Sequence, residues 1–268
     1  MRRLWAALLV SGMAGLGAGA ETSQQKGKRL VDEALAALGG QAYLNMRNRV
    51  ETGRIYGFYH EKLSGLGVDT LYTYYLPRLD PPEPGFLGVR VRDARGKKQD
   101  DVILYTEGTG YELTFRGARP LSDTIVKQFK VGTLHNVFYI LRQRLGEPGL
   151  IFDSRGSDFF ENRPIEIVDI TDANNDTVTV YFDQASKLPS RQLYYRRDPI
   201  DNEKLEEVTL FSKYRDVGGG VMWPFTIRRE RNGEKIFEMY SESVEINRDL
   251  NVSLFTLPQG MKILKKEK

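Results

Sequence analysis

The stretch 211–258 constrains the fold most, because its pattern is typical of two strands joined by a tight turn. The turn is Asn232-Gly233, a dipeptide suited to two-residue hairpins because both positions need positive φ. Before the turn, apolar side chains recur at every second position: Val221, Trp223, Phe225 and Ile227. This period predicts an antiparallel hairpin whose first strand has one apolar face.

The same hairpin carries a proline that restricts where its first strand can lie. Pro224 lacks the N–H that a ladder hydrogen bond needs, so the strand is expected at a sheet edge, or with its proline where no bond is required. We therefore expect an open sheet edge at residues 221–231. After the turn, strict alternation puts Tyr240 and Val244 on one face and Met239 on the other.

The first 20 residues have the three parts of a secretory signal peptide. Two arginines precede an apolar run, and a small-residue site ends at Ala20, where we expect cleavage. An uncleaved membrane anchor has less support, because glycines and a serine break the run and a spanning helix needs roughly 20 apolar residues. We expect residues 1–20 to be removed and residues 21–268 to form a single soluble, exported domain.

Composition excludes several classes of protein. The chain has no cysteine, which excludes disulfides, thiol catalysis and the lipid-bearing N-terminal cysteine of a lipoprotein. Without Arg2 and Arg3, 37 of the 39 basic residues remain, against 36 acidic residues. Such a close balance of positive and negative charges argues against a dedicated nucleic-acid binder. We therefore expect no nucleic-acid partner.

Helical patterns occur in three places. Residues 24–38 place leucines, valine and alanines on one stripe and end at Gly39, which predicts a helix. Ser122 can cap a second helix that Gly132 interrupts, and Thr133 can cap a third. Amphipathic helices between groups of strands are expected to lie across one face of a sheet.

Period-two patterns predict strands before and after the second and third helices. They lie at residues 49–59, 68–76, 86–92, 101–107, 111–116, 150–153, 164–171, 177–183, 190–197 and 205–214. With the hairpin added, this order implies an α+β fold in which one curved antiparallel sheet has helices on one side.

We find no catalytic or metal-binding motif. His60 and His135 are far apart and belong to no HxxxH or HExxH pattern, so a zinc site has little support. GxSxG is absent, and neighbouring carboxylates such as Glu206 and Glu207 on a strand point to opposite faces. We therefore expect no catalytic residue, no metal, no cofactor and no enzymatic activity.

Aromatic residues on strands are the main remaining signal, and two interpretations stay open. One is an ordinary core. The other is a concave apolar pocket for acyl chains, enclosed by the sheet and the helices. Arginines that could flank such a pocket are Arg54, Arg191, Arg228 and Arg229.

Three motifs carry a resemblance to a known family. They are YFDQASKLPSRQLYYRRD, YRDVGGGVMWPFTIRRERNGEKIFEMYSESVEIN and SLFTLP. Together they resemble the C-terminal half of the LolA-like outer-membrane lipoprotein-sorting proteins, whose relatives include LolB and LppX. The resemblance is strong from about residue 177 to 258 and loose elsewhere. It implies an incomplete, half-open β-barrel with helices as a lid over an apolar cavity.

The resemblance also implies a function: a periplasmic carrier that reversibly binds lipid or lipoprotein acyl chains for transport toward the outer membrane. Arg54 is the nearest match to the family's early-strand arginine and is expected at the head group. The expected cavity and lid residues are Tyr56, Phe58, Tyr72, Tyr74, Phe129, Phe138, Leu141, Trp223, Phe225 and Ile227. A membrane receptor protein is an implied partner, and we expect a monomer.

The alternative is a non-enzymatic cell-envelope interaction module on the same fold. Under that hypothesis, the protein's own side chains fill the cavity, and the edge expected at residues 221–231 docks a protein partner.

Overall fold

The computed structural model describes residues 20–77, 79, 86–199 and 201–266, so the expected signal peptide lies outside the described residues except for Ala20. Strands of the described chain form a single sheet in which every neighbouring pair is antiparallel. Its members are β1 (Asn48–Tyr59), β2 (Lys62–Tyr75), β3 (Val89–Arg95), β4 (Asp101–Tyr105), β5 (Gly110–Thr114), β6 (Gly117–Pro120), β7 (Ile151–Phe160), β8 (Arg163–Thr171), β9 (Thr177–Asp183), β10 (Pro189–Arg197), β11 (Lys204–Asp216), β12 (Met222–Arg231) and β13 (Glu234–Ile246).

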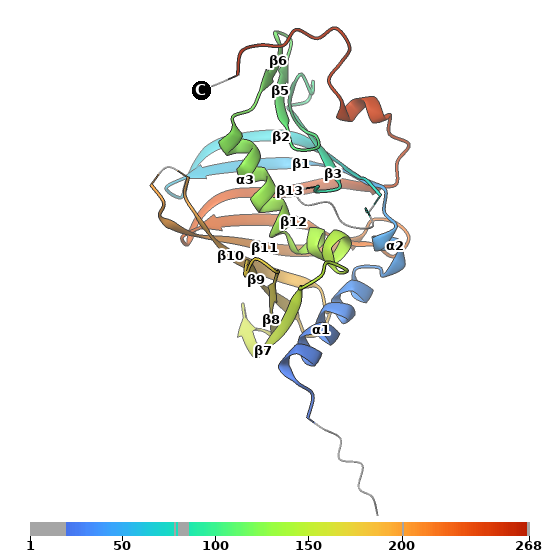
Figure 1. Ribbon diagram of the computed structural model, residues 1–268, viewed down its shortest axis with the longest axis vertical. Coiled ribbons are helices and arrows are strands. Elements are labelled where there is room, and N and C mark those ends of the chain that lie inside the picture. Colours follow the sequence, from blue (N-terminus) through green and yellow to red (C-terminus); the bar gives the residue numbers. More distant parts are fainter. Residues whose placement is uncertain (1–19, 78, 80–85, 200, 267–268) are drawn as a thin grey trace, which may run out of the picture.

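The sheet is curved and does not close into a barrel (Figure 1). From edge to edge the order is β6-β5-β4-β3-β2-β1-β13-β12-β11-β10-β9-β8-β7. The predicted fold class, an open curved antiparallel sheet with helices, is therefore confirmed. Two meanders meet where β1 pairs with β13, in a register that joins Arg49 to Ile246.

The helices are few and short. They are α1 (Ser23–Ala37), α2 (Gln41–Leu44), α3 (Asp123–Leu134), α4 (Val137–Tyr139), the π-helix η1 (Ile140–Arg144) and the 3₁₀-helix η2 (Val252–Phe255). Within the described residues, no helix combines the length and the apolar character that crossing a membrane requires.

Strand register defines two faces of the sheet, because directly paired residues share a face. The inner face carries the row Phe211, Ile227, Met239 and Ile55. The outer face carries the row Ser212, Thr226, Tyr240 and Arg54. Buried residues of α1, α4 and η1 pack with Phe211 and other inner-face residues in the main core.

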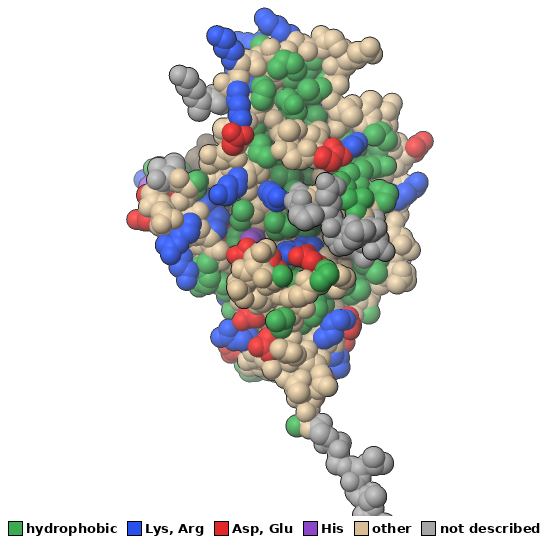
Figure 2. Space-filling model, in the orientation of Figure 1, with side chains coloured by type: hydrophobic (Ala, Val, Ile, Leu, Met, Phe, Trp, Pro, Cys, Tyr) green, Lys and Arg blue, Asp and Glu red, His purple; other side chains and the backbone are tan. Residues whose placement is uncertain are grey.

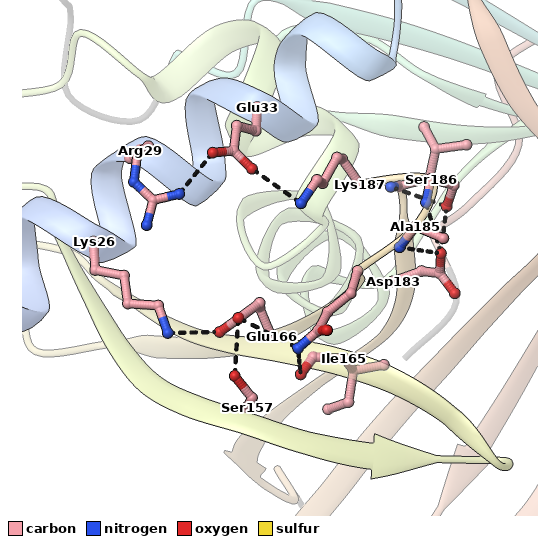
Figure 3. A network of polar contacts seen from close by, with 12 residues as sticks. Lys26, Arg29, Glu33, Ser157, Ile165, Glu166, Asp183, Ala185, Ser186 and Lys187 are labelled. Carbon is pink, nitrogen blue, oxygen red and sulfur yellow. Dashed lines mark hydrogen bonds and ion pairs between the residues drawn. The ribbon is translucent and has the colours of Figure 1, made fainter.

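Helix α1 is attached to β7 and β8, at one edge of the sheet, by packing and by an ion pair. Thr22 caps it through a reciprocal capping box with Gln25. A Cβ on Gly27 would lie 2.5 Å from a backbone oxygen of Phe152 on β7, so only glycine permits this approach. On its flank, Lys26 Nζ lies 2.9 Å from a carboxylate oxygen of Glu166 on β8 (Figure 3).

The predicted hairpin is confirmed, and its turn has the expected backbone. Asn232 and Gly233 have φ of 49° and 81°, as a turn with two positive φ values requires. The expected open edge is wrong, because β12 is paired on both sides, with β11 and with β13.

Pro224 nevertheless lies at a position where the ladder between β12 and β13 needs no hydrogen bond from its backbone nitrogen. It pairs with Tyr214 of β11, whereas the ladder between β12 and β13 starts only at Thr226. The second of the two expected options therefore holds: the proline is tolerated inside the sheet because its β13 side is unpaired.

Two helix boundaries differ from the sequence prediction. Ser122 caps α3 as predicted, but α3 continues through Gly132 to Leu134. Thr133 does not cap a helix, since its hydroxyl donates to the carbonyl oxygen of Phe129, and Asn136 caps α4 instead. Packing of the helix ends overrides the helix-breaking tendency of one glycine.

Beyond β13, the C-terminal segment packs on the outer face. Phe255 of η2 is fully buried, and its ring lies 5.4 Å from that of Tyr74. Further along, Ile263 forms a parallel bridge with Ala118 of β6. The segment thus covers the outer face of the first meander and pairs with one edge of the sheet.

Candidate functional site

Helix α3 crosses the inner face in front of β1, β13 and β12 (Figure 1). All twelve residues of α3 are described, and none of them is buried. A helix packed on a core buries one stripe of side chains. Helix α3 is therefore a bridge over the sheet that touches the main core through the partly buried Val131 near its C-terminal end.

This bridge has one attachment near its middle and one at its first residue. The ring of Phe129 stacks on that of Tyr105 of β4, with centroids 3.8 Å apart. Lys266 of the C-terminal segment forms an ion pair of 2.6 Å with Asp123. Figure 2 shows hydrophobic side chains exposed on the same side, over β5 and β6.

The C-terminal end is held more firmly. Arg144 of η1 donates to the carbonyl oxygen of Leu134 at 2.8 Å and also pairs with Asp172 at 2.9 Å. The ring of His135 stacks on Tyr194 with centroids 4.4 Å apart. We infer that α3 is held at its two ends and, near its middle, by the Phe129–Tyr105 stack.

The sheet surface beneath α3 is mostly apolar, and glycines leave space above it. One inner-face row joins Ile227, Met239, Ile55 and Gly67, and the next row joins Arg229, Phe237, Gly57 and Gly65. A Cβ on Gly65 would meet no atom within 4 Å, and one on Gly67 would make only ordinary contacts. We call Ile55, Gly65, Gly67, Ile227, Phe237 and Met239 the inner strip.

Part of the predicted cavity wall is core. Phe138, Leu141, Trp223 and Phe225 are all buried in the main core. The Phe138 ring lies 4.6 Å from Trp223. Ile227 lies at the boundary, since it packs against the core and belongs to the inner strip.

Other predicted residues lie on the outer face. Arg54 is exposed and pairs with Glu242 at 2.9 Å, and the Tyr56 ring lies 5.7 Å from Tyr240. Tyr72 and Tyr74 lie near the C-terminal segment, and Phe58 follows Tyr56 by two positions on β1. The structure therefore divides the predicted site between two faces and does not bring it together. Ligand contact by these residues stays a prediction.

Sequence reasoning missed a buried polar group on the inner face. Arg49 and Glu51 of β1 are 7% and 1% exposed, and Arg49 Nε lies 3.3 Å from Glu51 Oε2. The same carboxylate accepts hydrogen bonds from Trp223 Nε1 and Ser241 Oγ. The available signal was alternation, because Arg49, Glu51 and Gly53 fall on the face opposite to Arg54.

A pair of carboxyl groups lies on the inner face beside this group. Asp69 of β2 pairs with Arg95 of β3, and Asp93 also belongs to β3. Burial and the nearby charge of Asp93 raise the pKa of Asp69 to about 6, although Arg95 opposes the shift. Burial likewise raises the pKa of Asp93.

The raised pKa of Asp69 predicts a stability that falls as pH rises. The folded state keeps the proton of Asp69 up to about pH 6, whereas the unfolded chain loses it near the ordinary aspartate pKa of 3.8, so folding becomes less favourable between these values. We expect Asp69→Asn to raise the free energy of unfolding at pH 7 by about 1–2 kcal/mol and to change little at pH 3.5. Urea titrations from pH 3.5 to 7 measure this; the same gain from exposed Asp100→Asn would contradict it.

Comparisons with known proteins bear on the fold. No family model matches the sequence, and no curated protein matches it. Solved structures do match. An outer-membrane lipoprotein-sorting protein domain from Vibrio parahaemolyticus is 12% identical with a TM-score of 0.56, over 87% of this chain and 97% of the other. The chain has the LolA-like fold.

Two further structures agree with this assignment. A LolA superfamily protein from Nitrosomonas europaea is 12% identical with a TM-score of 0.51, covering 86% of this chain and 97% of the other. A DUF1329 family protein from Desulfovibrio piger is 12% identical with a TM-score of 0.58, covering 85% and 96%. At this identity the LolA-like likeness concerns the fold alone.

Proposed function

We propose that the chain is a periplasmic, non-enzymatic carrier that reversibly binds lipid or lipoprotein acyl chains for transport toward the outer membrane. The acyl chain lies between α3 and the inner strip. The observation that carries this proposal is α3 itself: it is anchored at both ends, crosses the strip and has no buried residue. Its apolar side chains outside the core, such as Ile125 and Val126, can cover a ligand without first leaving the core.

The binding energy comes from burial rather than from chemistry. Each methylene removed from water contributes about 0.8 kcal/mol, so an apolar strip under a helix can hold a chain without a covalent bond. Release requires the Phe129–Tyr105 stack to open, so that the middle of α3 can rise while its ends stay attached. The name of the Vibrio relative, a lipoprotein-sorting protein domain, is consistent with a cargo of this class.

The alternative function, a protein-interaction module, was expected to dock a partner through an open sheet edge at residues 221–231, and the structure has no such edge there. β12 is an interior strand, so its backbone offers no free edge for a partner. We therefore do not propose docking through residues 221–231.

A bulky residue on the strip tests the carrier proposal. We expect Gly67→Phe to weaken binding of a fluorescent fatty acid at least about tenfold, because the ring occupies the space of several methylenes. Leu66→Phe is the matched control: Leu66 is the neighbouring residue, 67% exposed and on the outer face. Fluorescence titration of both variants and the parent measures the effect.

Organic extracts of the gently purified protein should also contain an amphiphile in stoichiometric amount, detected by mass spectrometry. Absence of both fatty-acid binding and co-purifying lipid would contradict the proposal. So would equal effects of Gly67→Phe and Leu66→Phe, because a site on the inner face cannot respond equally to a change on the outer face.

A further inference from the structure

The outer face contains a hollow that the carrier proposal does not use. It spans β7 to β13, encloses about 300 Å³ and shares no residue with the inner strip. That volume lies at the lower end of the range for small-molecule sites. Its lining residues include Phe160, Glu161, Arg163, Asp183, Ser212, Lys213, Thr226, Arg228, Glu238 and Tyr240.

Register places the floor of the hollow on one face. Ser212, Thr226 and Tyr240 form one row, and Arg228 and Glu238 belong to the next. These positions alternate with core residues of the inner face. The floor is therefore part of a rigid sheet, which holds its polar groups in fixed positions.

Charge in the hollow is balanced. Three cations, Arg163, Lys213 and Arg228, face three carboxylates, Glu161, Asp183 and Glu238. Several are already paired: Arg163 lies 3.1 Å from Asp183. Balanced, partly neutralised charges give little net attraction to an anion or a cation, but they offer many hydrogen-bond donors and acceptors.

Two polar atoms at the floor lack a partner. Among the residues that the structure describes, Thr226 Oγ1 and Arg228 Nε are buried without a hydrogen bond, although Arg228 also pairs with Glu230 at 2.8 Å. Buried polar groups are rarely left unsatisfied in native proteins. Both atoms are covered, but a shift of the partly exposed Arg228 side chain would open them to a ligand rich in hydroxyl groups, because a hydroxyl donates and accepts.

Aromatic rings flank the polar floor. Tyr240 is 37% exposed, and its ring is held edge to face by Tyr56 with an interplanar angle of 87°. Phe160 lines the hollow near its opposite end, on β7. Aromatic faces attract the slightly positive hydrogens of C–H groups, which sugar rings present on one side.

We propose that this hollow binds a neutral saccharide. Aromatic faces, balanced charges and unsatisfied donors together match a ligand that has apolar C–H faces and hydroxyl edges without net charge. A fatty acid, a phosphate or a polyamine matches only one of these three features. The site is independent of the acyl-chain proposal, because it lies on the opposite face of the sheet.

Calorimetric titration of the full chain with maltotriose, cellotriose and the neutral N,N′,N″-triacetylchitotriose tests the proposal. We expect at least one trisaccharide to bind, Tyr240→Ala to weaken it roughly fivefold through loss of the aromatic face, and Ser212→Trp to abolish it by filling the exposed floor. Leu66→Phe, which lies outside the hollow, should leave saccharide affinity unchanged.

The proposal is overturned if none of the trisaccharides binds, or if one binds with unchanged affinity in both Tyr240→Ala and Ser212→Trp. Stronger binding of citrate or spermidine than of any trisaccharide also overturns it. Circular dichroism of each variant shows that the sheet is intact. Since Gly67→Phe leaves the hollow unaltered, loss of fatty-acid binding with retained saccharide binding separates the two sites.

Discussion

Trp223→Ala is expected to lower the free energy of unfolding by about 3–5 kcal/mol, the cost of removing a large buried aromatic side chain. Trp223 is 3% exposed, packs against Phe138 and lies under the guanidinium of Arg49, 3.8 Å from its ring. Its indole N–H also donates to Glu51. The change therefore leaves a cavity and removes one of the hydrogen bonds to a buried carboxylate, which keeps Arg49 and Ser241 as partners.

Chemical denaturation followed by circular dichroism measures this loss. Phe115→Ala is the control, because Phe115 is an aromatic residue with 89% exposure, and we expect its removal to change stability by less than about 0.5 kcal/mol. Similar losses in the two variants would show that Trp223 is not the centre of the core.

Glu51→Ala is expected to lower the free energy of unfolding by about 3–5 kcal/mol, for a different reason. It leaves the guanidinium of Arg49 buried without its carboxylate, and breaking a buried pair on one side is more costly than replacing both partners. Thermal or urea unfolding of the single variant measures the loss.

The double variant Arg49→Met, Glu51→Leu separates charge from packing. Because apolar residues of similar volume need no counter-ion, we expect it to recover most of the stability lost in Glu51→Ala. If the double variant is as unstable as Glu51→Ala, the loss arises from packing, and the buried charge is not its cause.

The sequence predicted the strands and the hairpin well, because their signals are local. Asn232-Gly233 demands positive φ at both positions whatever the rest of the chain does, and the structure shows that turn. The Ser122 cap is local in the same way. Alternation at Trp223 and Phe225 also identified a buried face.

What the sequence could not predict depends on distant strands. Pro224 implied an edge, but its tolerance comes from where the β12–β13 ladder starts. Strict alternation predicted that Val244 and Tyr240 lie on the same face of the sheet. In the structure, a register shift at Thr52 places Val244 opposite Glu51 on the inner face, whereas Tyr240 lies on the outer face. A single extra residue in one strand reverses every later side chain.

The sequence predicted the type of candidate site, but it did not predict most of the residues that form it. A lid and an apolar surface were expected, but the strip under α3 contains Gly65 and Gly67, whose contribution is the absence of a side chain. Arg54 was chosen for its position on an early strand, and the buried arginine of that strand is Arg49. Which of two arginines five residues apart faces inward depends on which face the helices cover.

The pairing of β1 with β13 has a consequence for how the chain reaches its native state. During synthesis or export the first long strand must wait for the last one, since Arg49 pairs with Ile246. Contacts this far apart in sequence are slow to form, and until they do, each meander has a long unpaired border that invites association with other chains. Truncation before β13 should therefore yield an aggregating polypeptide, and a holding chaperone would act in the interval before this seam closes.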